Sequence, residues 1–304
     1  MAERSASFAD ACARACPGFV AVAAPRRGRK SELLAGVVDG LPVIGKRTLR
    51  PNPIWDWYAD REVALYRAFQ RDPLPVTAPR LVAADHGVLV IECLAGAPMA
   101  TRRHPEAPLS RETLQAFVEL RARLAAWRGQ PPADPPPPRV RSRMRERLLE
   151  DPTAPMAWIR EGIGTCARRG ILDAGVARRL DDAIAEHAPV AFGHGDLLLR
   201  NVLGQGTQIA LVDWECAGLH IYDWDLALLW SQLAAPARPP LEDAVRSDRK
   251  RWRAFRALTV FALARELKFL RSFTANPRGV RLARLQAELA EAVARFADND
   301  PNRG

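Results

Sequence analysis

The stretch that decides the fold reads HGDLLLRNVLGQGTQIALVDWE at residues 194–215. Two short apolar runs within it, Asn201–Leu203 and Ile209–Val212, flank a turn that contains two glycines, and this pattern predicts a β-hairpin. Asn201 lies at the entry of the hairpin and Asp213 at its exit. Both polar side chains are therefore expected at one mouth of the hairpin, with Asp196 in the loop before it.

These three side chains suit chemistry on a phosphorylated nucleotide. Mg²⁺ is a hard cation that takes carboxylate and carbonyl oxygens, and Asn201 and Asp213 are its predicted ligands. Transfer of a phosphoryl group to a hydroxyl also needs a carboxylate that orients the hydroxyl and accepts its proton. Asp196 is expected in that catalytic role because the metal does not use it.

The same residues carry a family resemblance. His194-Gly195-Asp196 with Asn201 resembles the catalytic loop of the aminoglycoside phosphotransferases, bacterial relatives of choline kinases and protein kinases. Asp213-Trp214-Glu215 resembles the metal-binding segment of that family. The resemblance runs from about residue 18 to 270, and only the loop is highly specific.

This resemblance implies an α+β, bilobal protein-kinase-like fold. The expected small N-terminal lobe, residues 1–95, has an antiparallel sheet and one helix and binds the nucleotide. A hinge is expected at about 91–96. The larger, mainly helical C-terminal lobe, residues 97–304, is expected to carry the catalytic loop, the metal site and the substrate pocket.

The residue pattern of the first third agrees with such an N-terminal lobe. Apolar runs with strand character occur at 19–22, 33–38, 41–48, 80–84 and 88–94. The pair Asp39-Gly40 predicts a tight hairpin, because glycine accepts the positive φ that such turns require. The amphipathic stretch 58–70 predicts a helix.

The remainder reads as mainly helical. Ser110 is a good N-cap for a helix with an apolar stripe from Leu114 to Ala125. Further helices are predicted near 140–150, 156–169, 173–187, 241–272 and 278–297. The proline-rich residues 131–138 predict an extended surface connector.

By the resemblance, Lys46 is expected to contact the α- and β-phosphates of the nucleotide, and Glu62 is expected to pair with Lys46. The residues themselves support this, since a lysine in an apolar strand needs a partner and Glu62 lies in the nearby amphipathic helix. A strand-end lysine and a helix glutamate are usually surface residues. Their order before the metal loop favours the pair.

The resemblance also places the nucleotide base at the hinge, where main-chain groups of Glu92 and Leu94 would read the purine edge. The alternative is an ordinary buried strand that leads to a turn. The turn at 26–31 contains a lone Gly28 and no GxGxxG pattern, and Ser31 is the residue expected to meet phosphate there. Because the hinge reads purines through backbone atoms, ATP and GTP both stay open as donors.

Two residues are expected to brace the catalytic loop. Asp225 matches the aspartate that, in the family, fixes the loop through hydrogen bonds, and His194 is expected to hold the loop instead of moving a proton. The sequence departs from the family at Leu198, which replaces a second histidine. Any polar contact made by that histidine elsewhere is missing here.

The chain of 304 residues has a formal net charge of +10, which raises the alternative of a nucleic-acid-binding protein. Its basic residues are mostly arginines that are spread along the chain among acidic residues, a pattern typical of solvated helix faces. The densest basic cluster, residues 249–256, also contains Trp252 and Phe255 and is interpreted as a basic helix surface. Nucleic acid is therefore not the expected partner.

The five cysteines are an odd number without histidines at metal-ligand spacing, so neither a disulfide framework nor a zinc site is predicted. Cys12 and Cys16 are expected as small buried apolar residues. No stretch approaches the roughly 18 apolar residues of a membrane span, and charged residues interrupt the first apolar run, so no signal peptide is expected. The predicted location is the cytoplasm.

Charge also limits the second substrate. Residues 226–304 contain 15 Lys and Arg against 8 Asp and Glu, so the C-terminal lobe is not the acidic surface that would attract a polycation. The expected acceptor is a neutral or weakly charged hydroxylated compound, such as a nucleoside or peptide antibiotic or a sugar. Three tryptophans, Trp224, Trp230 and Trp252, either stack on such a substrate or belong to the core.

Three alternatives remain for the function. A metabolic kinase for a sugar, choline or an amino alcohol is the rival within the enzyme class. A kinase-like binding protein without activity would be expected to have lost Asp196, Asn201 or Asp213, and all three are present. A basic nucleic-acid-binding protein predicts salt-sensitive oligonucleotide binding and indifference to Mg·ATP.

Overall fold

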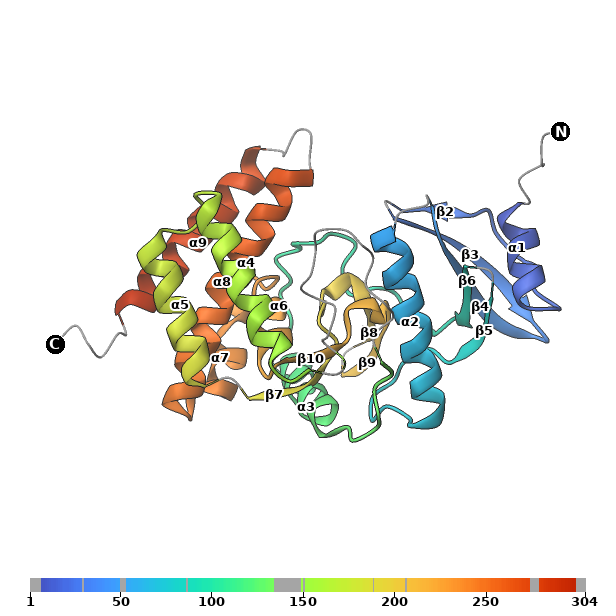
Figure 1. The fold of residues 1–304 in the computed structure, drawn as a ribbon, viewed down its shortest axis with the longest axis horizontal. Coiled ribbons are helices and arrows are strands. Elements are labelled where there is room, and N and C mark those ends of the chain that lie inside the picture. Colours follow the sequence, from blue (N-terminus) through green and yellow to red (C-terminus); the bar gives the residue numbers. More distant parts are fainter. Residues whose placement is uncertain are drawn as a thin grey trace.

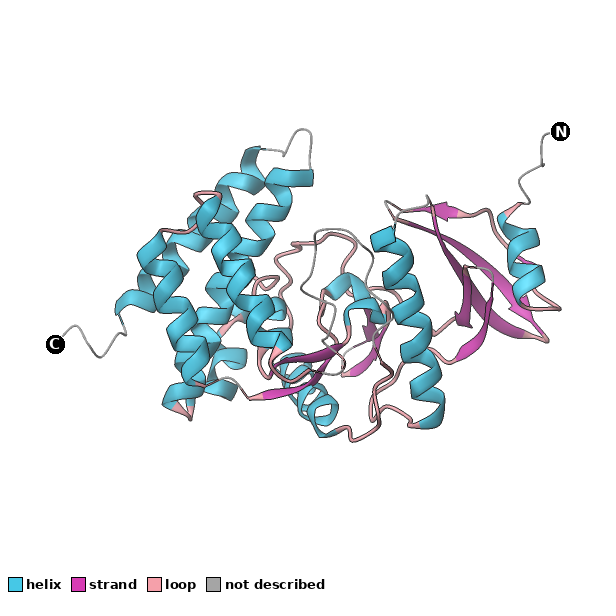
Figure 2. Cartoon of the chain, in the orientation of Figure 1, coloured by secondary structure: helices cyan, strands magenta, loops and turns pink. Residues whose placement is uncertain are grey.

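The computed structural model describes residues 7–28, 30–49, 53–85, 87–133, 149, 151–187, 189–205, 207–273 and 279–298. A sheet and two helices form one part of the molecule, and a larger, mainly helical part follows (Figures 1 and 2). The predicted α+β, two-lobed architecture is confirmed.

The sheet of the first part is antiparallel and has the strand order β1-β3-β4-β6-β5, with β2 paired to β3. Its strands are β1 Val20–Ala21, β2 Arg26–Arg27, β3 Ser31–Val38, β4 Leu41–Thr48, β5 Leu81–Asp85 and β6 Val88–Glu92. The predicted turn between β3 and β4 is present, and both of its residues, Asp39 and Gly40, have positive φ. The first predicted strand is reduced to the two residues of β1.

Two helices cover opposite faces of this sheet (Figure 1). Helix α1, Phe8–Ala15, starts with a capping box and packs Phe8 and Cys12 into a small core with β3, β4 and β6. The sheet makes room for it at Gly45, where an added Cβ would lie 2.5 Å from the Cys12 Sγ. Helix α2, Pro53–Arg71, covers the other face and begins earlier than the predicted residue 58.

The second part contains seven helices within the described residues. They are α3 Arg111–Ala126, α4 Ala154–Arg168, α5 Ala174–Glu186, α6 Trp224–Trp230, α7 Pro239–Arg246, α8 Arg249–Phe273 and α9 Gly279–Asp298. Ser110 caps α3 as predicted. The predicted helix near 140–150 and most of the predicted connector 131–138 lie outside the described residues.

The prediction of one helix over 241–272 is wrong. The chain forms α7 and then α8, with Ser247 and Asp248 between them. The Asp248 carboxylate accepts hydrogen bonds from the backbone N–H groups of Lys250 and Arg251 at 2.9 and 3.0 Å. A side chain that satisfies the first N–H groups of a helix starts a new helix at that point, and this signal outweighs the continuous apolar periodicity.

Two small antiparallel strand pairs lie between α5 and α6. The predicted hairpin is confirmed as β8 Val202–Gln205 and β9 Gln208–Leu211, and Asn201 belongs to the 3-10 turn Leu199–Asn201 directly before it. The second pair, β7 Val190–Gly193 with β10 Gly218–Ile221, was not predicted. Its strands are four residues each and far apart in sequence, so neither has a strong local pattern.

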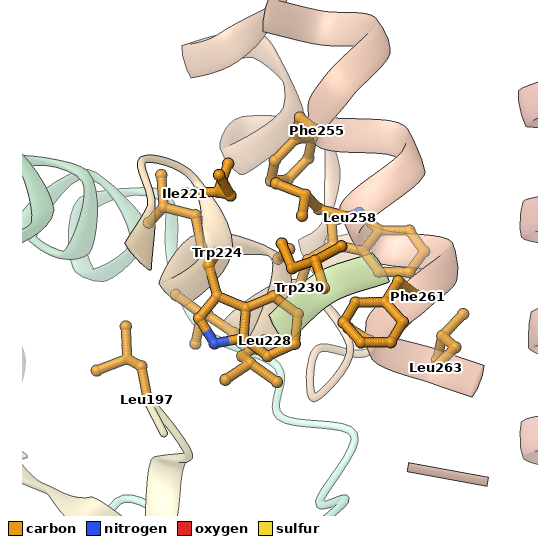
Figure 3. Close-up of a cluster of buried hydrophobic side chains, with 14 of the residues drawn as sticks. Leu197, Ile221, Trp224, Leu228, Trp230, Phe255, Leu258, Phe261 and Leu263 are labelled. Carbon is orange, nitrogen blue, oxygen red and sulfur yellow. The ribbon is translucent and has the colours of Figure 1, made fainter. Parts of the chain in front are cut away.

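One large hydrophobic core joins the two parts. Helix α2 contributes Leu65 and Tyr66 to the same buried cluster as Trp214 and the helices of the second part. Figure 3 shows the region of this core around Trp224, where Phe255 and Phe261 of α8 approach α6. Within the described ranges, each helix is too short or too polar to cross a lipid bilayer.

Candidate active site

The loop with Asp196 is fixed by the first turn of α6. Both oxygens of the buried Asp225 carboxylate accept main-chain hydrogen bonds, from His194 N and Gly195 N, each at 2.8 Å. Gly195 has φ +76, and a Cβ there would lie 2.2 Å from the Cys216 carbonyl oxygen, so the position requires glycine. The hydrogen bonds predicted for Asp225 are present.

Two further side chains tie the loop to its surroundings. The buried His194 ring places Nε2 3.0 Å from the Val212 carbonyl oxygen, which links the loop to the exit of the hairpin. Gln232 is completely buried, donates to the Leu197 carbonyl and accepts from Leu199 N. Leu198, the departure from the family, is buried completely. Apolar packing therefore replaces the second histidine.

The loop and the entry of the hairpin meet at Asp196 and Asn201. The Asn201 side-chain Nδ2 donates to the Asp196 carbonyl oxygen at 3.0 Å and lies 3.4 Å from its Oδ2. Because the amide nitrogen faces Asp196, the Oδ1 of Asn201 is left as the acceptor of that side chain. The exit of the hairpin lies beside it, since Val212 N donates to the Asn201 carbonyl oxygen at 3.0 Å.

Lys46 lies between two carboxylates. Its Nζ is 2.6 Å from Oε2 of Glu62 and 2.6 Å from Oδ1 of Asp213. Burial alone would lower the pKa of Lys46, but Asp213 and Glu62 raise it well above its usual range. Burial acts to raise the pKa of the Asp213 carboxyl, but the nearby charges of Lys46 and Lys30 hold this pKa far below its usual range. The predicted Lys46–Glu62 pair is present in the structure, and its role toward a nucleotide stays a prediction.

Two residues of this cluster were not among the predicted site residues. Lys30, in the turn before β3, forms an ion pair with Glu215, and the Glu215 carbonyl oxygen accepts a hydrogen bond from Arg61 at 2.8 Å. Asp213 and Glu215 raise the pKa of Lys30 against the effect of burial. The signal for Glu215 was its place in the DWE segment, whereas a lysine in a basic turn has no local signal that sets it apart.

The oxygen donors of this cluster fit a magnesium ion. Carboxylate oxygens of Glu62, Asp213 and Glu215 all lie within 4.8 Å of one another. The Glu62 Oε1 is buried and has no hydrogen-bond partner in the described part of the chain. Mg²⁺ prefers a few carboxylates, with phosphate and water completing its shell. Asp213 and Asn201, the predicted ligands, can therefore be joined by Glu215.

A cavity of about 250 Å³ adjoins Lys46 between α2 and the sheet. Ser31 and Lys46, both predicted to meet the nucleotide, share its wall with Lys30, Glu62 and Glu215. Glu92 and Leu94, predicted as hinge residues, do not line this cavity. The Glu92 carboxylate pairs with Arg80 at 2.9 Å, and Leu94 follows the end of β6. The expectations for Ser31, Glu92 and Leu94 stay predictions.

Arginines of the basic cluster 249–256 form ion pairs with acidic residues of neighbouring segments. Arg251 binds Asp223 through two contacts of 2.8 Å, and Arg253 lies 2.8 Å from Glu186. Phe255 is buried. These contacts favour the interpretation as a basic helix surface. Among the three tryptophans considered for substrate stacking, Trp224 and Trp230 are buried in the core, and Trp252 is partly buried.

Comparison with known proteins gives a family and a fold. Residues 50–259, well over half of the chain, match the model of the Phosphotransferase enzyme family. No curated protein matches the chain significantly.

Three similar solved structures cover nearly the whole chain. The macrolide 2'-phosphotransferase MphH from Brachybacterium faecium has a TM-score of 0.59 and 15% identity, over 97% of this chain and 98% of that chain. A putative fructosamine-3-kinase from Thermobifida fusca has a TM-score of 0.57 and 22% identity, over 95% and 99%. The aminoglycoside phosphotransferase APH(4)-Ia, in a ternary complex with ADP and hygromycin B, has a TM-score of 0.52 and 16% identity, over 91% and 94%.

Proposed function

The chain belongs to the phosphotransferase enzyme family, and on that premise we propose that it transfers the γ-phosphoryl group of ATP or GTP to a hydroxyl of a small molecule. The observation that carries the proposal is the convergence of two side-chain sets at one hairpin. The catalytic loop brings Asp196 against Asn201 at the hairpin entry, and the hairpin exit brings Asp213 against the Lys46–Glu62 pair.

The residues divide the work of the reaction. Asn201, Asp213 and Glu215 would hold Mg²⁺, and the bound ion would supply positive charge next to the phosphates. Lys46, kept protonated by its two carboxylates, binds the α- and β-phosphates. Asp196 orients the acceptor hydroxyl and takes its proton. The hydroxyl oxygen then bonds to the γ-phosphorus while the bond to the bridging oxygen breaks, and the nucleoside diphosphate leaves.

We place the nucleotide between the sheet and the hairpin. We assign its phosphates to Lys46 and Ser31 and its purine to the main chain of Glu92 and Leu94, where residues 1–95 and 97–304 would act as two lobes about the hinge. APH(4)-Ia, which shares the fold, binds ADP, and this supports an adenine nucleotide without excluding GTP. The cytoplasm is the proposed location, in keeping with five free thiols.

The proposed acceptor is a non-cationic hydroxylated compound, with a nucleoside or peptide antibiotic favoured over an aminoglycoside. The excess of basic residues in 226–304 supports this choice, because like charges repel a polycation. Phosphorylation of an antibiotic would give resistance. The rival is a metabolic kinase that acts on a sugar, choline or an amino alcohol.

A screen of acceptors tests the proposal. The protein is incubated with Mg·ATP or Mg·GTP and a panel of hydroxylated antibiotics and metabolites, and nucleoside diphosphate release is followed. The Asp196→Ala variant, expected to lose about 10²- to 10⁴-fold in rate, is the blank. Efficient turnover of kanamycin-like compounds with no turnover of nucleoside antibiotics would refute the acceptor preference. Failure to bind either Mg-nucleotide would refute the kinase assignment.

A further inference from the structure

Asp196 is bracketed by two arginines that do not hydrogen-bond to it. The Arg200 Nη2 lies 3.7 Å from one carboxylate oxygen, and the Arg265 Nη2 lies 3.5 Å from the other. Charge-assisted hydrogen bonds are shorter, at about 2.7–2.9 Å. Both guanidinium groups are therefore attracted to the carboxylate while their N–H donors on that side remain available to another acceptor.

The buried carboxylate of Glu266 fixes the position of the Arg265 guanidinium group through its other terminal nitrogen. Glu266 is completely buried and lies 3.1 Å from the Arg265 Nη1. The same carboxylate accepts two hydrogen bonds from Arg103, at 2.6 and 2.9 Å. Burial acts to raise the pKa of Glu266, but Arg103, His104 and Arg265 hold it well below the usual range. Glu266 is thus a fixed negative charge that keeps two arginines beside the base.

Within the described part of the chain, the charges of this group do not balance. Three guanidinium groups, those of Arg103, Arg200 and Arg265, face two carboxylates, those of Asp196 and Glu266. One positive charge is left over, next to the oxygen that would receive the hydroxyl proton. A cationic acceptor would be repelled there, and an uncharged one would leave the arginine donors without a strong partner. Carboxylate and phosphate groups match guanidinium geometry and charge.

We infer that the acceptor carries an anionic group, a carboxylate or a phosphate, near the hydroxyl that is phosphorylated, and that Arg200 and Arg265 bind this group. The inference rests on the proposed function, because it takes Asp196 as the base. Once the anionic group of the acceptor binds both guanidinium groups, the Asp196 carboxylate is released from them. It can then accept the hydrogen of the acceptor hydroxyl.

Matched pairs of charged and uncharged probes test this inference. Dissociation constants are measured by calorimetry for D-glucuronate against D-glucuronamide and for D-glucose 6-phosphate against D-glucose, at constant ionic strength. At least one acid is expected to bind roughly tenfold more tightly than its neutral partner, the ratio set by one charge-assisted contact. The pair that shows this ratio distinguishes a carboxylate from a phosphate. Equal binding within both pairs overturns the inference.

Variants assign the preference to the arginines. Arg265→Gln and Arg200→Gln are each expected to remove most of the preference for the acid, and Arg265→Lys to keep part of it. The Arg200 side chain is 39% exposed, so its variant is expected to fold even if the loss of the Arg265–Glu266 contact proves damaging. Arg160→Gln is the matched control, because Arg160 is an exposed arginine that pairs with Asp181 on another surface. A preference that survives in both Gln variants contradicts the proposal.

Binding of Mg·AMP-PNP is measured first on the same samples, which separates the two hypotheses. If the nucleotide does not bind, the proposed function fails, whereas the acid preference is still measured without it. If the nucleotide binds and the acids show no advantage, only the anionic acceptor is refuted. With an acceptor that turns over, the arginine variants are expected to raise KM by a larger factor than they lower kcat, as for residues that bind the ground state.

Discussion

The two sides of the proposed phosphoryl-transfer centre carry opposite excess charge. On the donor side, Lys30 and Lys46 face three carboxylates, those of Glu62, Asp213 and Glu215. On the acceptor side, the carboxylates of Asp196 and Glu266 face three arginines, Arg103, Arg200 and Arg265. Among these ion pairs of the described residues, the first set has one more carboxylate than lysine, and the second has one more guanidinium group than carboxylate.

This contrast indicates which partner each side completes. A surplus carboxylate next to Lys46, the proposed phosphate ligand, suits a divalent cation that arrives with a nucleotide. A surplus guanidinium next to the base suits an anionic acceptor. Asn201 and Asp213, which directly precede and follow one hairpin, join the two sides, so a short segment links two sites of opposite excess charge.

Substitutions at Asp196 and Asp213 are expected to give the largest effects and to separate the two sides. Asp196→Asn and Asp213→Asn are both expected to lower kcat by about 10²- to 10⁴-fold, the first through loss of the base and the second through loss of a metal ligand. Only Asp213→Asn is expected to weaken Mg-dependent nucleotide binding, measured by calorimetry with AMP-PNP in the presence and absence of Mg²⁺. Equal loss of nucleotide affinity in both variants would contradict the division into two sides.

Substitutions of the buried carboxylates Glu266 and Glu62 are expected to lower the stability of the protein by different amounts. Glu266→Ala leaves Arg103 and Arg265 without their buried partner and is expected to lower the free energy of unfolding by roughly 3–5 kcal/mol. Glu62→Gln is expected to cost less, about 1–3 kcal/mol, because Lys46 keeps its contact with Asp213. Urea unfolding of both variants measures the difference. If Glu62→Gln proves the more damaging, the donor side depends on its ion pair more than the geometry indicates.

Local sequence patterns predicted much of the donor side. The hairpin and its polar residues at entry and exit were predicted because strands and turns leave short-range signals. The pair of Lys46 and Glu62 was predicted from the family resemblance. The bracing of the loop by Asp225 also followed from the family resemblance. The structure contains the predicted contacts of Lys46, Glu62 and Asp225.

Asp196 was the one acceptor-side residue that was predicted, and the arginines and Glu266 around it were not, for a physical reason. Arg103 and Glu266 lie 163 positions apart in the chain, and no periodicity relates them. Arg265 appears in the sequence as one of many arginines on a long helix, and only its contact with Asp196 sets it apart. The ion pair of Lys30 with Glu215 was not predicted for the same reason, because only tertiary packing brings the turn before β3 next to the segment Asp213–Glu215.

The Asp225 carboxylate, which braces the loop shared by both sides, provides an intermediate test. Asp225→Asn replaces one acceptor oxygen by a donor, so one of the His194 and Gly195 N–H groups loses its partner. An unsatisfied buried donor costs about 1–3 kcal/mol, measurable as a lower urea midpoint. Because the loop holds Asp196, kcat is expected to fall while nucleotide affinity changes little. An unchanged kcat would show that the loop is fixed without this brace.

Two cysteines give the smallest effect and test the hinge on the donor side. Cys93, between Glu92 and Leu94, is exposed, whereas Cys12 is buried on the face of α1 that packs against the sheet. Burial raises the pKa of the Cys12 thiol to about 11. Since the thiolate is the reactive form, Cys93 is expected to react with iodoacetamide at about pH 8 and Cys12 is not. Mass spectrometry identifies the labelled residue, with Cys93→Ser as the control.

The labelling rate of Cys93 is expected to depend on the nucleotide, whereas Cys12 is expected to make the stability depend on pH. Mg·AMP-PNP at the hinge is expected to slow the labelling of Cys93 severalfold, whereas the acid probes of the acceptor side are expected to leave it unchanged. Labelling that is indifferent to the nucleotide would contradict the hinge assignment.

For Cys12 the folded state prefers the protonated thiol, so its contribution to stability is complete below the unfolded pKa of 9.0 and is lost as the pH rises toward about 11. Cys12→Ala is expected to remove this part of the alkaline destabilisation, because the group that titrates is then absent.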